Sequence, residues 1–217
     1  MTTTSSRRVL DPVDRVSEIL FGLIMALTFT CTISVAEAGE AEVREMLVGA
    51  LGCNIAWGIV DGTIFVLMNL IERARAVALH GALLASRDPA EARRLVADAL
   101  PPLLAQAVPD EELEHLRARL VALPMPTLHA RPRRDDWLGA IAIFLLVVLS
   151  TLPVAAPFAV IDDVGTALRT SNAIALAMLF ACGAVLARYA GRPPWLVGLV
   201  MSGIGAALVA ITIALGG

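Results

Sequence analysis

The sequence predicts an all-α integral membrane protein with five transmembrane helices and a small cytosolic helical insert between helices 2 and 3. Of its 217 residues, 58% are hydrophobic and only 17% are charged, and the mean hydropathy is +0.77. Soluble domains are about 45–50% apolar, so a single aqueous core could not bury this surface. The apolar residues also form long runs, and a helix of about 20 such residues crosses a bilayer. None of the runs shows the alternation typical of an outer-membrane barrel.

Five apolar runs are expected to be helices, because a segment in lipid must satisfy its own backbone amides. They span residues 19–36, 46–71, 137–161, 164–186 and 193–217, and their only charges are Asp61 in the second and Arg169 in the fourth. We therefore divide the chain into a cytosolic tail (1–14), helices 1 and 2 (15–71), the cytosolic insert (72–136) and helices 3 to 5 (137–217). The first run could instead belong to a signal peptide, since Arg7 and Arg8 precede it. The acidic residues around these arginines and the length of the run favour a transmembrane helix.

Arginine sets the predicted orientation, because the chain has no lysine and positive residues are retained in the cytoplasm. If the five helices alternate in direction, the arginine-rich ends before helix 1, after helix 2, before helix 3 and between helices 4 and 5 all lie on one side. The sequence therefore predicts a bacterial-type inner-membrane protein whose N-terminus is cytosolic and whose C-terminus is outside.

The insert contains leucines and valines at helical spacing over 90–104 and 111–123, which predicts two short amphipathic helices. Pro101 and Pro102 should end or kink the first of them. The helix of run two is expected to continue to about Ser86. Within the insert, a metal site is predicted at residues that share one helical face, and the alternative is a solvated charged surface. These residues are Glu111, Glu114 and His115.

An ionisable side chain at membrane depth is costly, so Asp61 is the first functional candidate. Asn54 and Met68 recur with it on one helix face, and these oxygen and sulfur ligands suit a metal such as Fe²⁺ or Mn²⁺. The alternative is that Asp61 only hydrogen-bonds to a neighbouring helix. In helix 1, Glu18 and Met25 are spaced to line a cytosolic mouth for cations, unless Glu18 is an ordinary interfacial charge.

Three further features of the apolar runs have structural interpretations. Pro153 and Pro157 should bend helix 3, or else open backbone carbonyls toward a cation. Arg169 is expected to pair with Asp162 or Asp163 at the membrane surface. The cysteines have neither disulfide-framework nor zinc-site spacing and are expected to pack as small apolar residues. They are Cys31, Cys53 and Cys182.

Enzymes and nucleic-acid-binding proteins are not favoured by this sequence. It has no nucleophile paired with a base, no phosphate-binding loop and no metalloprotease motif, so we expect no enzyme and no cofactor. The net charge of −3 and the absence of a basic stripe argue against nucleic acid as a partner.

Several short segments resemble the vacuolar iron transporter (VIT) family, as does the order of helices with an insert between the second and the third. The segments are Phe21-Gly22, Leu152 to Phe158 and the stretch Gly203-Ile204-Gly205-Ala206-Ala207. The resemblance implies a homodimer whose first helices conduct Fe²⁺ or Mn²⁺ in exchange for protons, while glutamates of the insert collect cytosolic metal.

The chain departs from the family pattern at two positions. Met25 stands where the family has an aspartate, and Gly58-Ile59 where it has Gly-Glu, so Glu18 and Asp61 would have to form a changed site. The first hypothesis is therefore a divalent metal ion transporter with its path along Glu18, Met25, Asn54, Asp61 and Met68. The alternative is a non-transporting membrane protein whose arginine-rich insert docks a cytosolic partner or anionic lipid.

Overall fold

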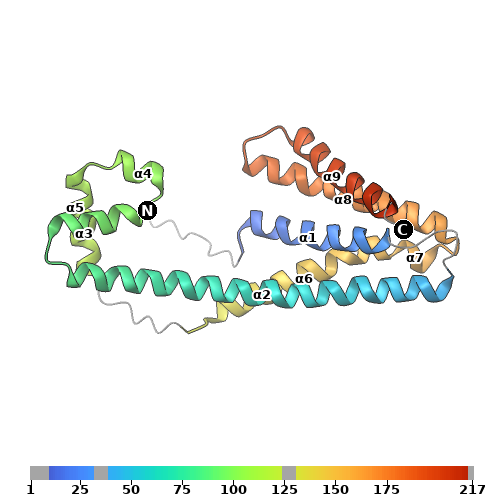
Figure 1. Ribbon diagram of the computed structural model, residues 1–217, viewed down its shortest axis with the longest axis horizontal. Helices are drawn as coiled ribbons and strands as arrows, with labels where there is room; N and C mark the ends of the chain where they lie inside the picture. The colour runs from blue at the N-terminus through green and yellow to red at the C-terminus, as the bar shows by residue number, and fades with distance from the viewer. Residues whose placement is uncertain (1–9, 32–38, 124–130, 215–217) are drawn as a thin grey trace, which may run out of the picture. The chain divides into compact units, whose positions relative to one another are not determined.

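The computed structural model describes residues 10–31, 39–123 and 131–214, and each regular element within them is a helix (Figure 1). The chain forms two compact units, and α2 contributes to both. Unit 1 comprises Met1–Phe65 and Arg134–Gly217, and unit 2 comprises Val66–Arg133. The elements are α1 (Pro12–Thr30), α2 (Glu40–Ala85), α3 (Pro89–Asp98), α4 (Pro102–Ala107), α5 (Asp110–Ala122), α6 (Arg134–Ala155), α7 (Pro157–Val160), α8 (Val164–Tyr189) and α9 (Pro194–Ala214).

Four helices in the described ranges are long and apolar enough to cross a membrane: α2, α6, α8 and α9. The prediction of an all-α fold is thus confirmed over the described residues, and these four helices are candidate membrane spans. Helix α1 is not among the four, and it carries Asp14, Arg15 and Glu18 in its first two turns. It covers Pro12–Thr30 rather than the predicted 19–36, and the end of that run lies outside the described residues. The count of five transmembrane helices stays a prediction.

Helix α2 is much longer than a membrane is thick. Its 46 residues correspond to about 69 Å at 1.5 Å per residue, whereas the hydrocarbon layer is roughly 30 Å thick. The charged residues that begin at Glu72 lie in the part of α2 that belongs to unit 2. The predicted continuation of this helix to about Ser86 is confirmed, since α2 ends at Ala85.

The predicted third span is interrupted rather than simply bent. Helix α6 contains Pro153 but ends at Ala155, and the single turn α7 begins at Pro157. Proline has no N–H to donate, so two prolines four residues apart leave carbonyls without their usual helical partners. Near this break the Ser171 hydroxyl of α8 donates to the Val154 carbonyl at 2.7 Å. The helical donor of this carbonyl would be the Phe158 N–H beyond the break, and a neighbouring helix supplies a donor in its place.

Helices α8 and α9 form a tightly packed hairpin. Gly191 adopts φ +63, and the Arg192 N–H donates to the Ala187 carbonyl at 2.9 Å, which is the bonding of a glycine-ended helix. A Cβ atom at Gly183 would lie 2.8 Å from the Val197 carbonyl oxygen, so the absence of a side chain at position 183 lets the two helices touch.

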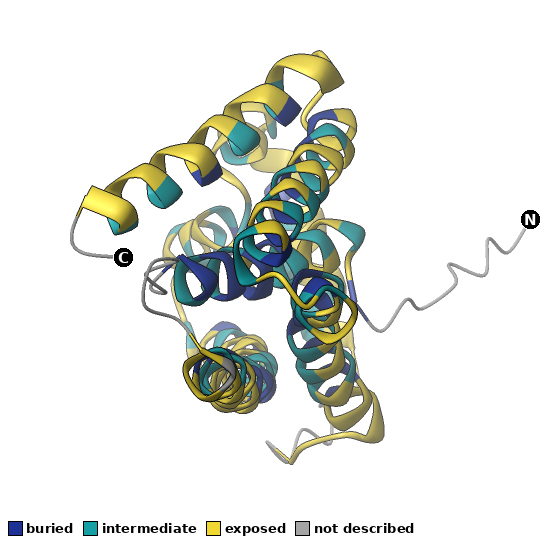
Figure 2. Cartoon of the chain, turned by 90° about the vertical axis from the view of Figure 1, so that its right-hand side faces the viewer, coloured by how far each residue is buried: buried dark blue, intermediate teal, exposed yellow. Residues whose placement is uncertain are grey.

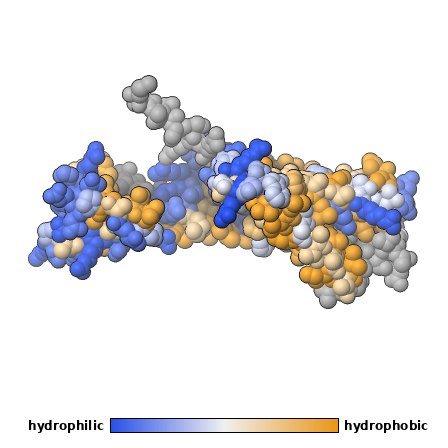
Figure 3. All heavy atoms as spheres, turned by 90° about the horizontal axis from the view of Figure 1, so that it is seen from above, coloured by the Kyte–Doolittle hydropathy of each residue, from blue (hydrophilic) through white to orange (hydrophobic). Residues whose placement is uncertain are grey.

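The core of unit 1 is small and central. Leu23 and Leu27 of α1, Val154 of α6 and Leu179 of α8 form its buried centre. Most of the remaining apolar side chains face outward, and α9 is exposed along much of its length (Figure 2). Hydrophobic surface covers much of unit 1 in Figure 3, whereas unit 2 is mainly hydrophilic in that view. Outward apolar faces of this kind are suited to contact with lipid.

Unit 2 contains three short helices rather than the two predicted. Pro101 and Pro102 were expected to end or kink the helix over 90–104. Helix α3 does end before them, at Asp98, and a separate turn, α4, starts after Pro101. The Asp88 side chain accepts from the Ala90 N–H at 2.9 Å and so caps α3. The buried core of the unit consists of Leu83 from α2, Ala92 and Val96 from α3, and Leu113 from α5.

Candidate functional site

A pair of acidic side chains meets between α1 and α2 in unit 1. The carboxyl groups of Glu18 and Asp61 interact directly, and Asp14, one turn before Glu18, adds a further negative charge nearby. Oε2 of Glu18 and Oδ2 of Asp61 are both buried without a hydrogen-bond partner among the residues that the structure describes. The pair therefore presents acceptor oxygens with no donor to satisfy them.

Asn54 lies two turns before Asp61 on α2 and is fully buried. Its Nδ2 donates to the Gly22 carbonyl of α1 at 3.2 Å, which ties the two helices together. Its Oδ1 is a third buried acceptor that no described donor reaches. The site is thus rich in oxygen acceptors at two successive levels between α1 and α2.

Glycines set the position of the α2 face that carries these residues. A Cβ atom at Gly58 would lie 3.1–3.3 Å from atoms of Phe144 on α6, and one at Gly62 would lie 3.0 Å from the Ala140 carbonyl oxygen. The two glycines are one turn apart, and Asp61 lies between them in sequence. Close packing on α6 therefore sets how far α2 is shifted along its axis and how it is rotated about that axis. The position at which Asp61 meets Glu18 follows from both.

Two half-buried carboxyl groups in contact disfavour a negative charge on each other, because like charges repel. A proton or a cation bound between them relieves this repulsion. A cation that binds there displaces the proton, since metal ligands must be deprotonated. This coupling between proton release and cation binding is the chemistry that the arrangement can perform.

The methionines predicted for the path are placed differently from the carboxyl pair. Met25 is half-buried, two turns beyond Glu18 on α1. Met68 is half exposed and belongs to the part of α2 in unit 2. The arrangement around Glu18 and Asp61 is therefore dominated by oxygen atoms rather than by sulfur.

An apolar cavity of about 110 Å³ follows the acceptor oxygens along the same helix faces. Ala26 of α1 lies one turn beyond Gly22, Ala50 of α2 lies one turn before Asn54, and both line this cavity. Thr30 and Thr151 also line it, but their hydroxyls donate to the carbonyls of Leu27 and Val148 in their own helices. Apart from these two hydroxyls, the side chains that line the cavity are apolar.

The three residues predicted as a metal site in the insert do line one pocket of unit 2, together with Arg93 and Asp110. However, Nε of Arg117 donates to both carboxylate oxygens of Glu114 at 2.9 Å, and this contact lowers the pKa of Glu114. Within the part of the chain that the structure describes, no three His, Cys, Asp or Glu side chains converge as a metal site. Metal binding by Glu111, Glu114 and His115 stays a prediction.

Sequence reasoning placed Glu18 and Asp61 in one changed site but predicted neither their direct contact nor the contact of Asn54 with Gly22. The spacing Gly58-x-x-x-Gly62 was the available signal for close approach of another helix. Arg169 was expected to pair with Asp162 or Asp163. No ion pair joins Arg169 to either aspartate in the described residues, although its charge adds to the lowering of the Asp163 pKa after the larger effects of the Thr166 hydroxyl and N–H.

Comparison with known proteins places the chain in a family. A model of the VIT family matches residues 84–217, which is well over half of the chain. No curated protein matched the sequence. The matched segment begins at the end of α2 and includes α3 to α9, whereas Glu18, Asn54 and Asp61 precede it. Together with the apolar helices, the match shows that this integral membrane protein belongs to the VIT family, a family of metal ion transporters.

Proposed function

We propose that this protein carries Fe²⁺ or Mn²⁺ across a bacterial-type inner membrane in exchange for protons, through the contact between α1 and α2. The observation that supports this most is the pairing of Glu18 with Asp61, each with a buried oxygen that has no described donor. A divalent cation neutralises such a pair, and protons replace it when it leaves.

The proposed path has an acidic entrance and a weaker second level. Glu18 and Asp61 supply the charge that attracts and desolvates the ion, and the free Oδ1 of Asn54 supplies a neutral oxygen two turns away on α2. Met25 and Met68 add thioether ligands on the two helices in this proposal, which favours ions that are softer than Mg²⁺. Orientation follows the arginines, with the N-terminus in the cytosol and the C-terminus outside.

In the proposed assembly, the functional form is a homodimer and the insert collects metal from the cytosol. In this proposal the pocket lined by Glu111, Glu114 and His115 serves this role, and Arg117 releases Glu114 when a cation binds. Neither role is required for the carboxyl pair to exchange a cation for protons, so the path and the assembly are separate parts of the proposal.

Uptake into proteoliposomes under an imposed pH gradient tests the proposal. Wild-type protein should take up Fe²⁺ or Mn²⁺ saturably and move protons in the opposite direction. Asp61→Asn and Glu18→Gln should each reduce the rate by about tenfold or more, since loss of one charged ligand costs at least about 1.4 kcal/mol. Glu72→Gln, which changes an exposed carboxylate elsewhere on α2, is the matched control and should leave uptake unchanged.

The opposite result would be equally informative. If correctly folded wild-type protein moves neither ion above empty liposomes, the transporter proposal fails. The alternative, a non-transporting protein whose insert docks a cytosolic partner or anionic lipid, would then be favoured.

A further inference from the structure

The contact between α1 and α2 in unit 1 passes through three successive levels. The carboxyl pair is the first level. One turn further along α1, the Gly22 carbonyl accepts from Asn54 and forms the second level. After another turn, Ala26 and Ala50 line the apolar cavity of about 110 Å³, which is the third level. The hydrogen bond between Asn54 and Gly22 therefore lies between the carboxyl pair and the cavity.

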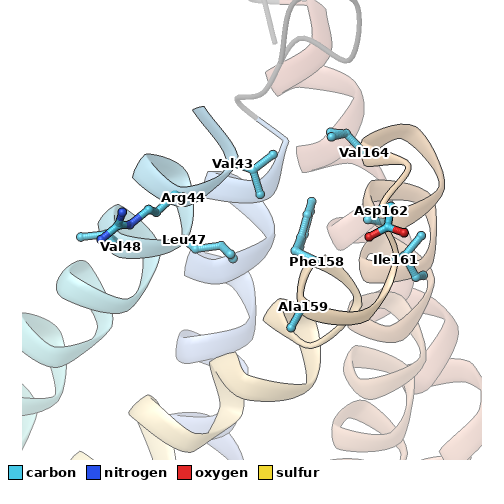
Figure 4. Close-up of a pocket in the computed structure, with 10 residues that line it drawn as sticks. Val43, Arg44, Leu47, Val48, Phe158, Ala159, Ile161, Asp162 and Val164 are labelled. Carbon is cyan, nitrogen blue, oxygen red and sulfur yellow. The ribbon is translucent and has the colours of Figure 1, made fainter. Parts of the chain in front are cut away.

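The cavity leads on to a larger pocket of about 350 Å³ near the start of α2. Leu47 of α2 lines both of them, so the two spaces adjoin. Figure 4 shows Leu47 on one side of this outer pocket and Phe158 with Asp162 on the other. An acidic side chain, Asp162, is thus present beyond the cavity, on the opposite side of the second level from the carboxyl pair.

The second level is the most deeply buried part of this contact. Asn54 is fully buried and Ser150 of α6 is 5% exposed, whereas the two side chains of the carboxyl pair are only half-buried. A Cβ atom at Gly22 would overlap the Ser150 hydroxyl, so α6 packs directly against this level. Gly22, Asn54 and Ser150 therefore form a closed layer between the carboxyl pair and the cavity.

The closed layer contains acceptor oxygens that are not fully used. Oδ1 of Asn54 is buried and has no described donor. The Ser150 hydroxyl donates to the Val147 carbonyl at 2.7 Å, which uses its proton and leaves its oxygen as an acceptor. Packing alone does not explain an asparagine here, because a buried acceptor without a donor costs stability and an apolar side chain would avoid that cost.

We propose that Asn54 is the gate of the metal path, a role that rests on the transport function proposed above. In the closed state its amide donates to the Gly22 carbonyl and blocks the way from the carboxyl pair to the cavity. When this hydrogen bond breaks, Oδ1 of Asn54, the Ser150 hydroxyl and the Gly22 carbonyl bind the divalent cation in passage. These oxygens are neutral and hold the ion more weakly than carboxylates do, so it moves on toward Asp162.

Two substitutions at Asn54 should have opposite effects if this residue is a gate. Asn54→Ala leaves an opening in the closed layer, so proteoliposomes under an imposed pH gradient should leak protons even without metal. Asn54→Leu fills the layer with a side chain of similar size that binds no ion. Uptake of Fe²⁺ or Mn²⁺ should then fall about tenfold, with no proton leak. A purely structural role would move both variants in the same direction.

Three further measurements keep the test specific. Binding of Mn²⁺ to the carboxyl pair in detergent should be unchanged in both Asn54 variants, which also shows that they are folded. Ser150→Ala removes one oxygen and keeps the Asn54–Gly22 hydrogen bond, so it should slow uptake about fivefold without a leak. Asn172→Ala is the matched control and should change neither quantity, because Asn172 is a half-buried residue of α8 that accepts from the Cys31 thiol.

The wild-type protein separates the failure of the gate from the failure of the transport function. If the wild type takes up metal, the absence of a leak in Asn54→Ala, or unchanged uptake in both Asn54→Leu and Ser150→Ala, would overturn the gate alone. Absence of uptake by the wild type would overturn the transport function, and the gate with it.

Discussion

Gly22 lets α1 lie directly against α6, next to the site. A methyl group there would overlap the Ser150 hydroxyl and lie 2.6 Å from the Val147 carbonyl oxygen. We expect Gly22→Ala to destabilise the protein by about 1–3 kcal/mol, the usual cost of overpacking. Gly52→Ala is the control, because a Cβ atom there meets nothing within 4 Å, and it should be neutral or stabilising. Thermal unfolding midpoints in detergent provide the comparison, and equal shifts for the two variants would contradict the packing argument.

Asp163 should make a pH-dependent contribution to stability. The Thr166 hydroxyl and N–H both lower the pKa of this carboxyl group below its ordinary value of 3.8. A group whose pKa is lower in the folded state stabilises the protein above its unfolded pKa, and the contribution disappears as the pH falls through the folded value.

Asp163→Ala should therefore lower the unfolding midpoint at pH 7 and have a smaller effect near pH 3. Asp162→Ala is the matched control, since Asp162 caps no helix. A difference between wild type and Asp163→Ala that stayed constant from pH 7 to pH 3 would show that the charge plays no part.

At the scale of single helices, the break between α6 and α7 depends on a hydrogen bond from another helix. Ser171 is fully buried, and its hydroxyl donates to the Val154 carbonyl. Ser171→Ala should cost about 1 kcal/mol or more, because it leaves this carbonyl without a described side-chain donor. Thr170→Ala should cost less, since the Thr170 hydroxyl donates only within α8, to the Thr166 carbonyl. Amide hydrogen exchange of α6 and α7 would detect the loosening, and equal exchange in the two variants would argue against this role.

The sequence predicted which segments form helices better than it predicted where those helices end. The apolar runs became α2, α6, α8 and α9, and the end of α2 was predicted to within one residue, because apolar composition and charge depend on local sequence alone. Pro101 and Pro102 were expected to end or kink the first helix of the insert, but the end at Asp98, before both prolines, and the separate turn α4 were not predicted. The extra charges at the start of α1 left the number of membrane spans undecided.

The site was predictable residue by residue but not as an arrangement. Asp61 and Glu18 stood out because charges within or beside apolar runs are costly. Their contact depends on how α1, α2 and α6 pack, which single-helix periodicity does not encode.

At the scale of the whole molecule, the family match and the candidate path occupy different parts of the chain. The VIT match covers residues 84–217, whereas the acceptor oxygens of Glu18, Asn54 and Asp61 lie before it. The matched part supplies α6, α8 and α9, which pack around α1 and hold it in place. In the proposed function, the family scaffold is kept while the ion site on α1 and α2 is built from changed residues.

Binding of Mn²⁺ to the solubilised full-length protein tests this central claim most directly, because Mn²⁺ is followed by its paramagnetic resonance without transport. The protein is compared with Glu18→Gln, Asp61→Asn and the double variant. If the two carboxyl groups form one site, each single change should weaken binding by about tenfold or more, and the double variant should be little worse than either. Unchanged affinity in both single variants, or losses that simply add in the double variant, would contradict a shared site at Glu18 and Asp61.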